Sequence, residues 1–217
     1  MDVERWPNLP ELLKQRLNQP LPGRAAQSAF APELSYGRQY GPADADAKPA
    51  SVTILLYPHQ GQWQLPLTLR PEHLPDHAGQ VSFPGGAVDA GESSKTAALR
   101  ELREELGVQA GVRILGALTT AYVFASNFVV TPWVAHTYAR PAMEPCPAEV
   151  AELIEAPLAD LVDPAHHGRH QVSRNGLEFI APHFQCGAHR VWGVTAIMLG
   201  ELIAVLRDVT GDERPPN

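Results

Sequence analysis

The chain alternates between apolar runs and segments rich in helix- and strand-breaking residues, and this alternation predicts its elements. A short helix is predicted near the N-terminus, with Asn8 as a candidate N-cap and Pro10 in its first turn. Its apolar residues recur at helical spacing: Leu9, Leu12, Leu13 and Leu17. We expect this helix to pack on the main domain rather than to bind a partner. Residues 19–49 are rich in Pro, Ala and Gly and predict a long irregular connection.

Apolar residues of high β-propensity then predict a hairpin. Residues 51–57 form a candidate buried strand, residues 58–62 a turn, and residues 63–70 the partner strand. The next segment, residues 71–86, contains too many proline and glycine residues to form a helix.

The second half of the chain predicts further strands around one central helix. That helix covers 94–106 and ends at Gly107, and a last helix covers 194–209. The stretch 148–162 is apolar and acidic and is assigned no element. Further strands are predicted at 112–118, 120–125 and 128–138. Strands before and after a central helix, with another helix at the end, predict a mixed α/β layered fold.

Length and charge restrict the class of protein. The 217 residues suit one domain, or one domain with an appendage, and are enough to bury a core. A net charge of -7 without a basic run argues against nucleic acid and against an anionic membrane surface as partners. A polyanionic small molecule stays open, because a bound metal ion can reverse the local field.

The termini and the cysteines favour a cytoplasmic protein. The first residues carry acids and prolines where a signal peptide needs a basic start and an apolar run. No stretch is long and apolar enough to span a bilayer. Cys146 and Cys186 favour two reduced thiols, although the sequence leaves a disulfide between them open.

Three glutamates crowd one side of the helix predicted over 94–106. Glu101 lies three positions before Glu104 and four before Glu105, so the carboxylates are neighbours on the helix surface. The apolar stripe of the same helix, which can pack on a sheet, is rotated away from them: Ala98, Leu102 and Leu106.

Such a cluster has two interpretations. Closely packed carboxylates repel each other unless a cation joins them, and magnesium prefers oxygen ligands. The alternative is a solvated charged face, with ion pairs from the glutamates to Arg100 and Arg103.

The loop before the helix favours the metal site. Its glycines, Gly85 and Gly86, allow the backbone to approach a ligand closely. From Gly86, Glu92 follows after five intervening residues and Arg100 after seven more. The remaining fixed positions are Glu101, Leu102, Glu104, Glu105, Gly107 and Val108. Position for position, this series resembles the Nudix box.

The resemblance implies a Nudix fold, which is an α/β/α sandwich with a mixed central sheet. It implies hydrolysis of a nucleoside diphosphate linked to another moiety, with Mg²⁺ or Mn²⁺ as the cofactor. Arg100 would orient a glutamate, and Glu104 or Glu101 would be the nearest candidate base. The implied metal ligands are Glu101, Glu104, Glu105 and the carbonyl of Gly85. The residues implied to fix the loop–helix arrangement are Gly86, Glu92 and Gly107.

The segment before the box is similar to the signature of the coenzyme A pyrophosphatase branch of this family. The residues in step with it are Leu67, Thr68, Arg70, Leu74, His77, Gly79, Gln80, Phe83 and Pro84. That branch often has a second basic residue where this chain has Pro75 and Asp76. Residues 130–134 and 189–196 also resemble the branch. The substrate-binding residues implied are Arg70, His77, Gln80 and Phe83.

Each of these residues also has a structural alternative. Arg70 can hold a phosphate bidentately or pair with an acid such as Glu72. His77 can bind phosphate or stabilise its own loop. Trp192 suits a core or helix-entry position better than an adenine platform. Three histidines without a spaced Cys or acidic partner predict an exposed loop: His166, His167 and His170.

We therefore expect three parts: an N-terminal extension with a short helix at 1–49, a Nudix domain at 50–210, and a flexible tail at 211–217. The expected reaction cleaves coenzyme A, with its oxidised and acylated forms as related substrates, into 3′,5′-ADP and 4′-phosphopantetheine. Hydrolysis of ADP-ribose, NADH or another nucleoside diphosphate derivative is the nearest alternative. A non-catalytic nucleotide-binding domain is an alternative of another class. The sequence leaves the oligomeric state open, a homodimer included.

Overall fold

The fold is described from a computed structural model of the chain, for residues 1–33, 43–74, 77–174 and 176–211. The predicted tail beyond Gly211, and the Pro75–Asp76 pair, lie outside the described residues. Within the described part, Cys146 and Cys186 are both free thiols. No helix of this part has both the length and the apolar character needed to cross a membrane.

An eight-stranded sheet forms the centre of the molecule. Its main path runs β3-β2-β1-β7-β5, while β4 pairs with β1, β6 with β7 and β8 with β2. Strands β1 and β7 are parallel and the other pairs are antiparallel, so the sheet is mixed as predicted. The strands are β1 (Lys48–His59), β2 (Gln62–Leu69), β3 (Val81–Ser82), β4 (Gly85–Ala87), β5 (Arg113–Ala117), β6 (Ala121–Val123), β7 (Phe128–His136) and β8 (Glu152–Pro157).

The predicted hairpin is formed by β1 and β2. Its turn is tight, because Gln60 and Gly61 both have positive φ, 49° and 76°. Two such residues in succession match the twist of the flanking strands. The turn fixes the register, with His59 opposite Gln62.

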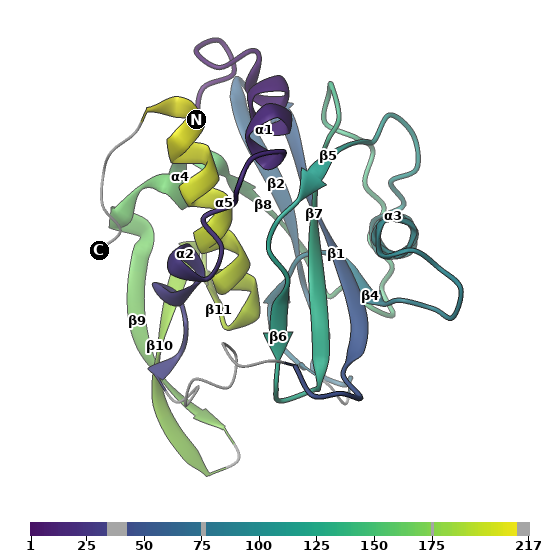
Figure 1. The fold of residues 1–217 in the computed structure, drawn as a ribbon, viewed down its shortest axis with the longest axis vertical. Coiled ribbons are helices and arrows are strands. Elements are labelled where there is room, and N and C mark those ends of the chain that lie inside the picture. Colours follow the sequence, from purple (N-terminus) through teal and green to yellow (C-terminus); the bar gives the residue numbers. More distant parts are fainter. Residues whose placement is uncertain (34–42, 75–76, 175, 212–217) are drawn as a thin grey trace.

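Helices cover the sheet on both sides, which confirms the α/β/α sandwich. Figure 1 shows α3 on one side, and α1, α2 and α5 on the other. The helices are α1 (Leu9–Leu17), α2 (Arg24–Ser28), α3 (Ser94–Leu106), α4 (Leu158–Val162) and α5 (Val194–Thr210), with a short 3₁₀ helix at Pro164–His166.

Strand β1 is buried on both faces, and its alternation divides the core in two. Ile54 and Leu56 belong to the cluster that includes the residues of α1 and α5. Leu55 and Tyr57 belong to the cluster that includes the residues of α3. Successive side chains of a strand point to opposite faces, so one apolar run supplies both layers.

The N-terminal segment completes the α5 side of the sheet. Leu9 and Leu13 of α1 are fully buried, while Asn8 stands at the N-cap without a side-chain capping bond. Helix α2 lies inside the connection predicted to be irregular; five residues are too few for an apolar period to show.

A buried carboxylate on α5 ties this segment down. Glu201 is 0% exposed. It accepts hydrogen bonds from the N–H of Gly23 at 3.0 Å and the side-chain amide of Gln27 at 2.9 Å. It also accepts bonds from the N–H of Thr119 at 3.1 Å and its hydroxyl at 2.6 Å.

A second, three-stranded antiparallel sheet was not foreseen in the sequence. It consists of β9 (His167–Arg174), β10 (Leu177–Cys186) and β11 (His189–Trp192). The predicted exposed histidine loop is therefore wrong: His167 and His170 lie in β9 and both are part-buried. His167 Nε2 lies 2.8 Å from the carbonyl of Leu161, and His170 Nδ1 lies 3.0 Å from His183 Nδ1. Pairing to β10, which no local pattern reveals, gives this polar segment its structure.

Candidate active site

Helix α3 begins and ends where the sequence predicts. Ser93 is the N-cap, and its hydroxyl accepts a hydrogen bond from the N–H of Thr96 at 3.1 Å. At the other end Gly107 has a φ of 71°, and its N–H donates to the carbonyl of Arg103 at 2.9 Å. A residue without a side chain adopts this left-handed conformation at little cost.

The apolar stripe fixes the rotation of α3. Ala98, Leu102 and Leu106 are all fully buried. Thr53 of β1 donates its hydroxyl hydrogen to the carbonyl of Ala98 at 2.8 Å, which sets the helix directly against the sheet. Because this rotation is fixed, the three glutamates beside the stripe are buried to different extents.

Glu105 is the deepest of the three glutamates, with 4% of its surface exposed. One oxygen accepts the N–H of Gly85 at 3.4 Å and the other the hydroxyl of Thr68 at 3.5 Å, both long contacts. Burial raises the pKa of the Glu105 carboxyl to about 8; the bond from Gly85 opposes that rise and the charges of Glu101 and Glu149 add to it. This carboxylate is poorly compensated by the protein alone.

Glu101 lies at the edge of the same site. Its side chain is 12% exposed and accepts a hydrogen bond from Arg100 at 2.8 Å. Burial raises the pKa of the Glu101 carboxyl, against the effect of Arg100. A Cβ at Gly86 would overlap the Oε1 atom of Glu101, so glycine at this position allows the glutamate to approach the loop. Gly86 is thus required by the position of the glutamate.

Arg100 joins the loop to the helix. It binds Glu92 through two contacts of 3.2 and 3.1 Å and donates to the carbonyl of Ala87 at 3.0 Å. Its bonds to Glu92, Glu101 and Glu104, in that order, raise the pKa of the guanidinium against its burial. The same contact acts on Glu92: its hydrogen bond with Arg100 lowers the pKa of the Glu92 carboxyl. Arg100 is fully engaged with protein atoms, in the orienting position that the resemblance implies.

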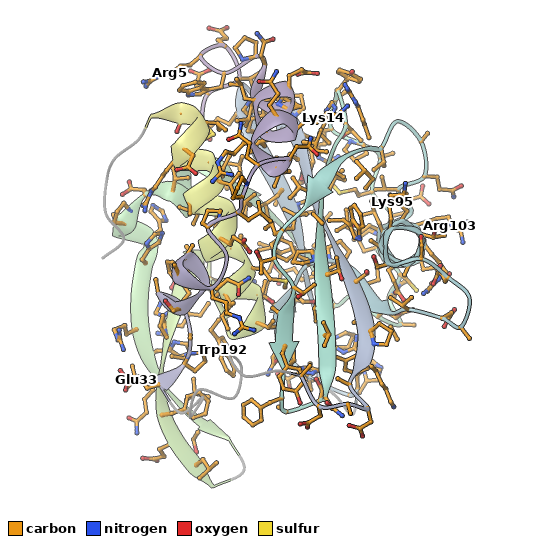
Figure 2. The ribbon with its side chains drawn as sticks, viewed as in Figure 1. Arg5, Lys14, Glu33, Lys95, Arg103 and Trp192 are labelled. Carbon is orange, nitrogen blue, oxygen red and sulfur yellow. The ribbon has the colours of Figure 1, made fainter. Side chains whose placement is uncertain are left out.

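Glu104 is placed differently from the other two glutamates. Its side chain is 42% exposed, and it contacts Arg100 at 3.0 Å and Arg103 at 3.8 Å. Figure 2 shows Arg103 on the side of α3 away from the sheet. The structure therefore brings Glu101 and Glu105 together and leaves Glu104 at the solvent edge.

A fourth carboxylate, which the sequence analysis did not single out, completes the cluster. Oxygen atoms of Glu101, Glu105 and Glu149 all lie within 4.8 Å of one another. Glu149 stands in the loop before β8, inside the acidic stretch 148–162. Within the described residues this is the one group of three or more side chains suited to hold a metal ion.

The loop that carries Glu149 is fastened to the end of α3. The N–H of Cys146 donates to the carbonyl of Glu105 at 2.8 Å, and the N–H of Glu144 donates to that of Leu106 at 2.9 Å. The N–H of Glu149 then donates to the carbonyl of Cys146 at 3.0 Å. These bonds use carbonyls that a helix end leaves unpaired, and they bring Glu149 to the cluster.

The donor set fits a hard divalent cation. Carboxylate oxygens from two chain segments converge, and Mg²⁺ and Mn²⁺ accept such ligands. Glu105, with its long contacts and raised pKa, has the most to gain from a cation. The carbonyl of Gly85 stays a predicted ligand; the atom of Gly85 that reaches the cluster is its N–H.

The residues expected to bind substrate divide into two groups. Arg70 stands just after β2, and its charge acts on Glu105. His77 and Gln80 lie in the same loop and bond to each other, Nδ1 to Oε1, at 2.9 Å. Phe83, by contrast, is 1% exposed within the core, where a substrate does not reach it. Its large apolar ring is used for packing.

Trp192 takes the helix-entry position that the sequence favours. It ends β11, two residues before α5 begins, and Figure 2 shows it beside that end of the helix. Its ring lies 6.2 Å from that of Phe179 and 6.1 Å from that of His170.

The mixed sheet and the glutamate-bearing helix together define a class of metal-dependent hydrolase. Comparison with known proteins identifies the family: the one described as NUDIX domain matches residues 47–175. The chain belongs to the Nudix family. Such proteins are generally divalent-metal-dependent hydrolases of diphosphate bonds in small-molecule nucleotides.

Three similar proteins illustrate the relation. Nudix hydrolase 3 of Caenorhabditis elegans is 33% identical over 182 residues, which cover 76% of each chain. Human mitochondrial coenzyme A diphosphatase NUDT8 is 35% identical over 159 residues, 70% of this chain and 67% of the relative. The solved structure of RenU, a Nudix hydrolase from M. smegmatis, has a TM-score of 0.50 at 18% identity, over 79% of this chain and 90% of that one. The structural likeness supports the fold alone.

Proposed function

We propose that this chain hydrolyses the diphosphate bond of coenzyme A, giving 3′,5′-ADP and 4′-phosphopantetheine, with Mg²⁺ or Mn²⁺ at the carboxylate cluster. The observation that carries the hydrolytic part is the convergence of Glu101, Glu105 and Glu149. Coenzyme A is chosen because the loop with Arg70 and His77 resembles the coenzyme A branch. The similarity to the human coenzyme A diphosphatase supports the same choice.

The protein side of the reaction follows from the charges. Glu101 and Glu105 would hold the metal ion, Arg100 would keep Glu101 in place, and Arg70 would meet a phosphate of the substrate. When bound, the metal ion neutralises phosphate oxygens and lowers the pKa of a water molecule. In the hydrolysis as a whole, a water oxygen forms a bond to phosphorus, the bridging P–O bond breaks, and the phosphate that leaves keeps the electron pair of that bond.

The proton of the attacking water needs an acceptor. Glu101 and Glu104 are the bases that the box offers, and the structure adds Glu149 as a third candidate. Glu149 approaches the cluster from a separate loop, so of the three converging carboxylates we take Glu149 as the proton acceptor and Glu101 and Glu105 as the ligands of the ion. We assign the base to Glu149.

The assignment of the base has a direct test. Glu149→Gln should lower kcat by at least about tenfold, because general base catalysis contributes that much or more. Glu144→Gln changes an exposed glutamate of the same loop and should keep wild-type kcat. If Glu149→Gln turns over normally while Glu104→Gln does not, the base is Glu104 instead.

The substrate is tested by a panel measured with Mg²⁺ and with Mn²⁺. Coenzyme A, its disulfide and an acyl derivative should show the highest kcat/KM, and ADP-ribose and NADH lower values. If coenzyme A stays intact while ADP-ribose or NADH is cleaved rapidly, the nearest alternative holds. Glu104→Gln and Glu105→Gln test the non-catalytic alternative. An enzyme should lose most of its turnover in these variants, whereas a non-catalytic binding domain shows no turnover even as the wild type.

A further inference from the structure

His77 has a backbone conformation that most side chains disfavour. Its φ is 57°, and in the described part of the chain only Gln60 and Asn127 are other non-glycine residues with positive φ. Those two lie in the hairpin turns β1–β2 and β6–β7, where such values are required. His77 lies in the wider loop between β2 and β3, where it begins the turn that the N–H of Gln80 closes. Strained residues of this kind gather at functional sites.

Backbone hydrogen bonds join the two ends of this loop and also close a turn that begins at His77. The N–H of Arg70 donates to the carbonyl of Gln80 at 3.0 Å, and the N–H of Gly79 donates to that of Arg70 at 3.1 Å. The N–H of Gln80 donates to the carbonyl of His77 at 3.1 Å. These bonds bring the side chains of His77 and Gln80 together.

The contact between the two side chains selects one form of the imidazole. Nδ1 of His77 lies 2.9 Å from Oε1 of Gln80. An amide oxygen only accepts hydrogen bonds, so Nδ1 carries the hydrogen. Of the two neutral tautomers only the Nδ1–H form keeps this bond, and the imidazolium keeps it as well. In both forms Nε2 is the nitrogen left to meet a ligand.

This loop stands beside the carboxylate cluster. Thr68, two residues before the loop base at Arg70, donates its hydroxyl hydrogen to Glu105 at 3.5 Å, which places the loop base near that carboxylate. Five residues after Gln80, Gly85 donates to Glu105 at 3.4 Å. The other titratable groups among the described residues of the loop are Glu72, next to Gly79, and the exposed His73.

We propose that Gln80 is a positioning residue for His77, and that the pair recognises a phosphate group of the substrate with His77 as an imidazolium. This rests on the proposed function, because it needs a phosphorylated substrate at the cluster. A phosphate oxygen carries no hydrogen, so Nε2 binds it only as N–H. Since Gln80 already holds the hydrogen on Nδ1, phosphate binding takes up one proton.

The positioning role can be tested without a substrate. Long-range ¹H–¹⁵N spectra of histidine-labelled protein at pH 8.5 report the tautomer of each ring. The His77 signal, assigned as the one lost in His77→Asn, should be the Nδ1–H form; Asn tolerates positive φ, so the loop is kept. In Gln80→Leu the ring should change to the Nε2–H form. An Nε2–H ring in the wild type, or an Nδ1–H ring in Gln80→Leu, would overturn the positioning role.

The phosphate role is tested by the pH dependence of KM at saturating metal, on whichever substrate of the panel is cleaved fastest. In the wild type KM should rise with pH, by up to about tenfold per pH unit, once the imidazole loses its proton. Gln80→Glu should move this rise to higher pH by about one unit, because a carboxylate favours the imidazolium. His77→Asn should remove the rise.

The outcomes separate this proposal from the choice of substrate. His73→Asn alters an exposed histidine of the same loop and should keep the wild-type profile. If the profiles of Gln80→Glu and the wild type coincide, the phosphate role is wrong whatever the substrate. If another nucleotide replaces coenzyme A but the shift occurs, the proposed function fails and the recognition by His77 and Gln80 stands.

Discussion

Two glutamates are buried on opposite faces of the sheet, and their surroundings differ. Glu201 of α5 is 0% exposed and accepts four hydrogen bonds of 2.6 to 3.1 Å. Glu105 of α3 is 4% exposed and has two contacts, of 3.4 and 3.5 Å, with two further carboxylates close by. Burial is therefore not what distinguishes a binding site from a structural group. The difference lies in how far the protein itself compensates the charge.

The largest expected effect is on the α5 side. Glu201→Ala leaves the part-buried N–H groups of Gly23 and Thr119 without their acceptor and opens a cavity. We expect a loss of about 3 kcal/mol or more in the free energy of unfolding. Urea denaturation measures it, with Glu4→Ala as an exposed control. A loss below about 1 kcal/mol, the size of one ordinary hydrogen bond, would remove the contrast between the two glutamates.

On the α3 side the charge should matter for metal and turnover rather than for folding. Glu105→Gln should lower kcat/KM by about a hundredfold or more, which is about 2.7 kcal/mol of transition-state stabilisation. Above about pH 8, where Glu105 is ionised, the metal-free thermal midpoint of this variant should stay the same or rise, because a charge without adequate partners is removed. Glu144→Gln is the matched control. Activity retained in both Glu104→Gln and Glu105→Gln would contradict the metal site.

The raised pKa of Glu105 predicts how the metal-free protein responds to pH. The folded state holds the Glu105 proton up to about pH 8, whereas an unfolded glutamate releases it near pH 4.5. The folded state therefore binds more protons between these values, and this contribution to stability is lost as the pH rises from about 4.5 to 8. Thermal midpoints with a chelator should show the loss, and saturating Mn²⁺ should reduce it. The loss should be smaller in Glu105→Gln; equal slopes in both proteins would contradict the assignment.

The smallest effect is expected from a surface pair that joins α1 to α5. Arg16 and Asp208 lie 2.7 Å apart, with 16% and 48% of their side chains exposed. Asp208→Asn should cost at most about 1 kcal/mol in urea denaturation, because solvent and salt weaken such pairs. A larger cost would mean that the attachment of α1 depends on this pair more than on its buried leucines.

The catalytic helix could be predicted because everything that defines it is local. Ser93, the apolar stripe and Gly107 fall within fifteen residues, and the fixed spacing of the box adds Arg100 and Glu92. Five strands of the central sheet, β1, β2, β5, β6 and β7, could also be placed to within a few residues, whereas β3, β4 and β8 lie in segments to which no strand was assigned. Local signals suffice where one segment determines its own conformation.

The rest depends on contacts between distant segments. Glu149 lies close to Glu101 but comes from a separate loop of no fixed length, so its position in the cluster cannot be predicted from a sequence spacing. The donors to Glu201 come from residues 82 to 178 positions away along the chain. Strand β9 is mostly polar and becomes a strand by pairing with β10. Phe83 falls in a functional signature, yet its ring is needed in the core.

The position of the first and last helices bears on where this protein can be divided. Family likeness spans residues 47–175, but α1 and α2 precede that range and α5 follows it. These helices cover Ile54 and Leu56, which are 0% exposed, and supply both Glu201 and two of its donors. A fragment trimmed to the range of likeness would expose one whole apolar layer to water and would be prone to aggregate. The range that the family model matches is thus smaller than the set of elements that buries the core.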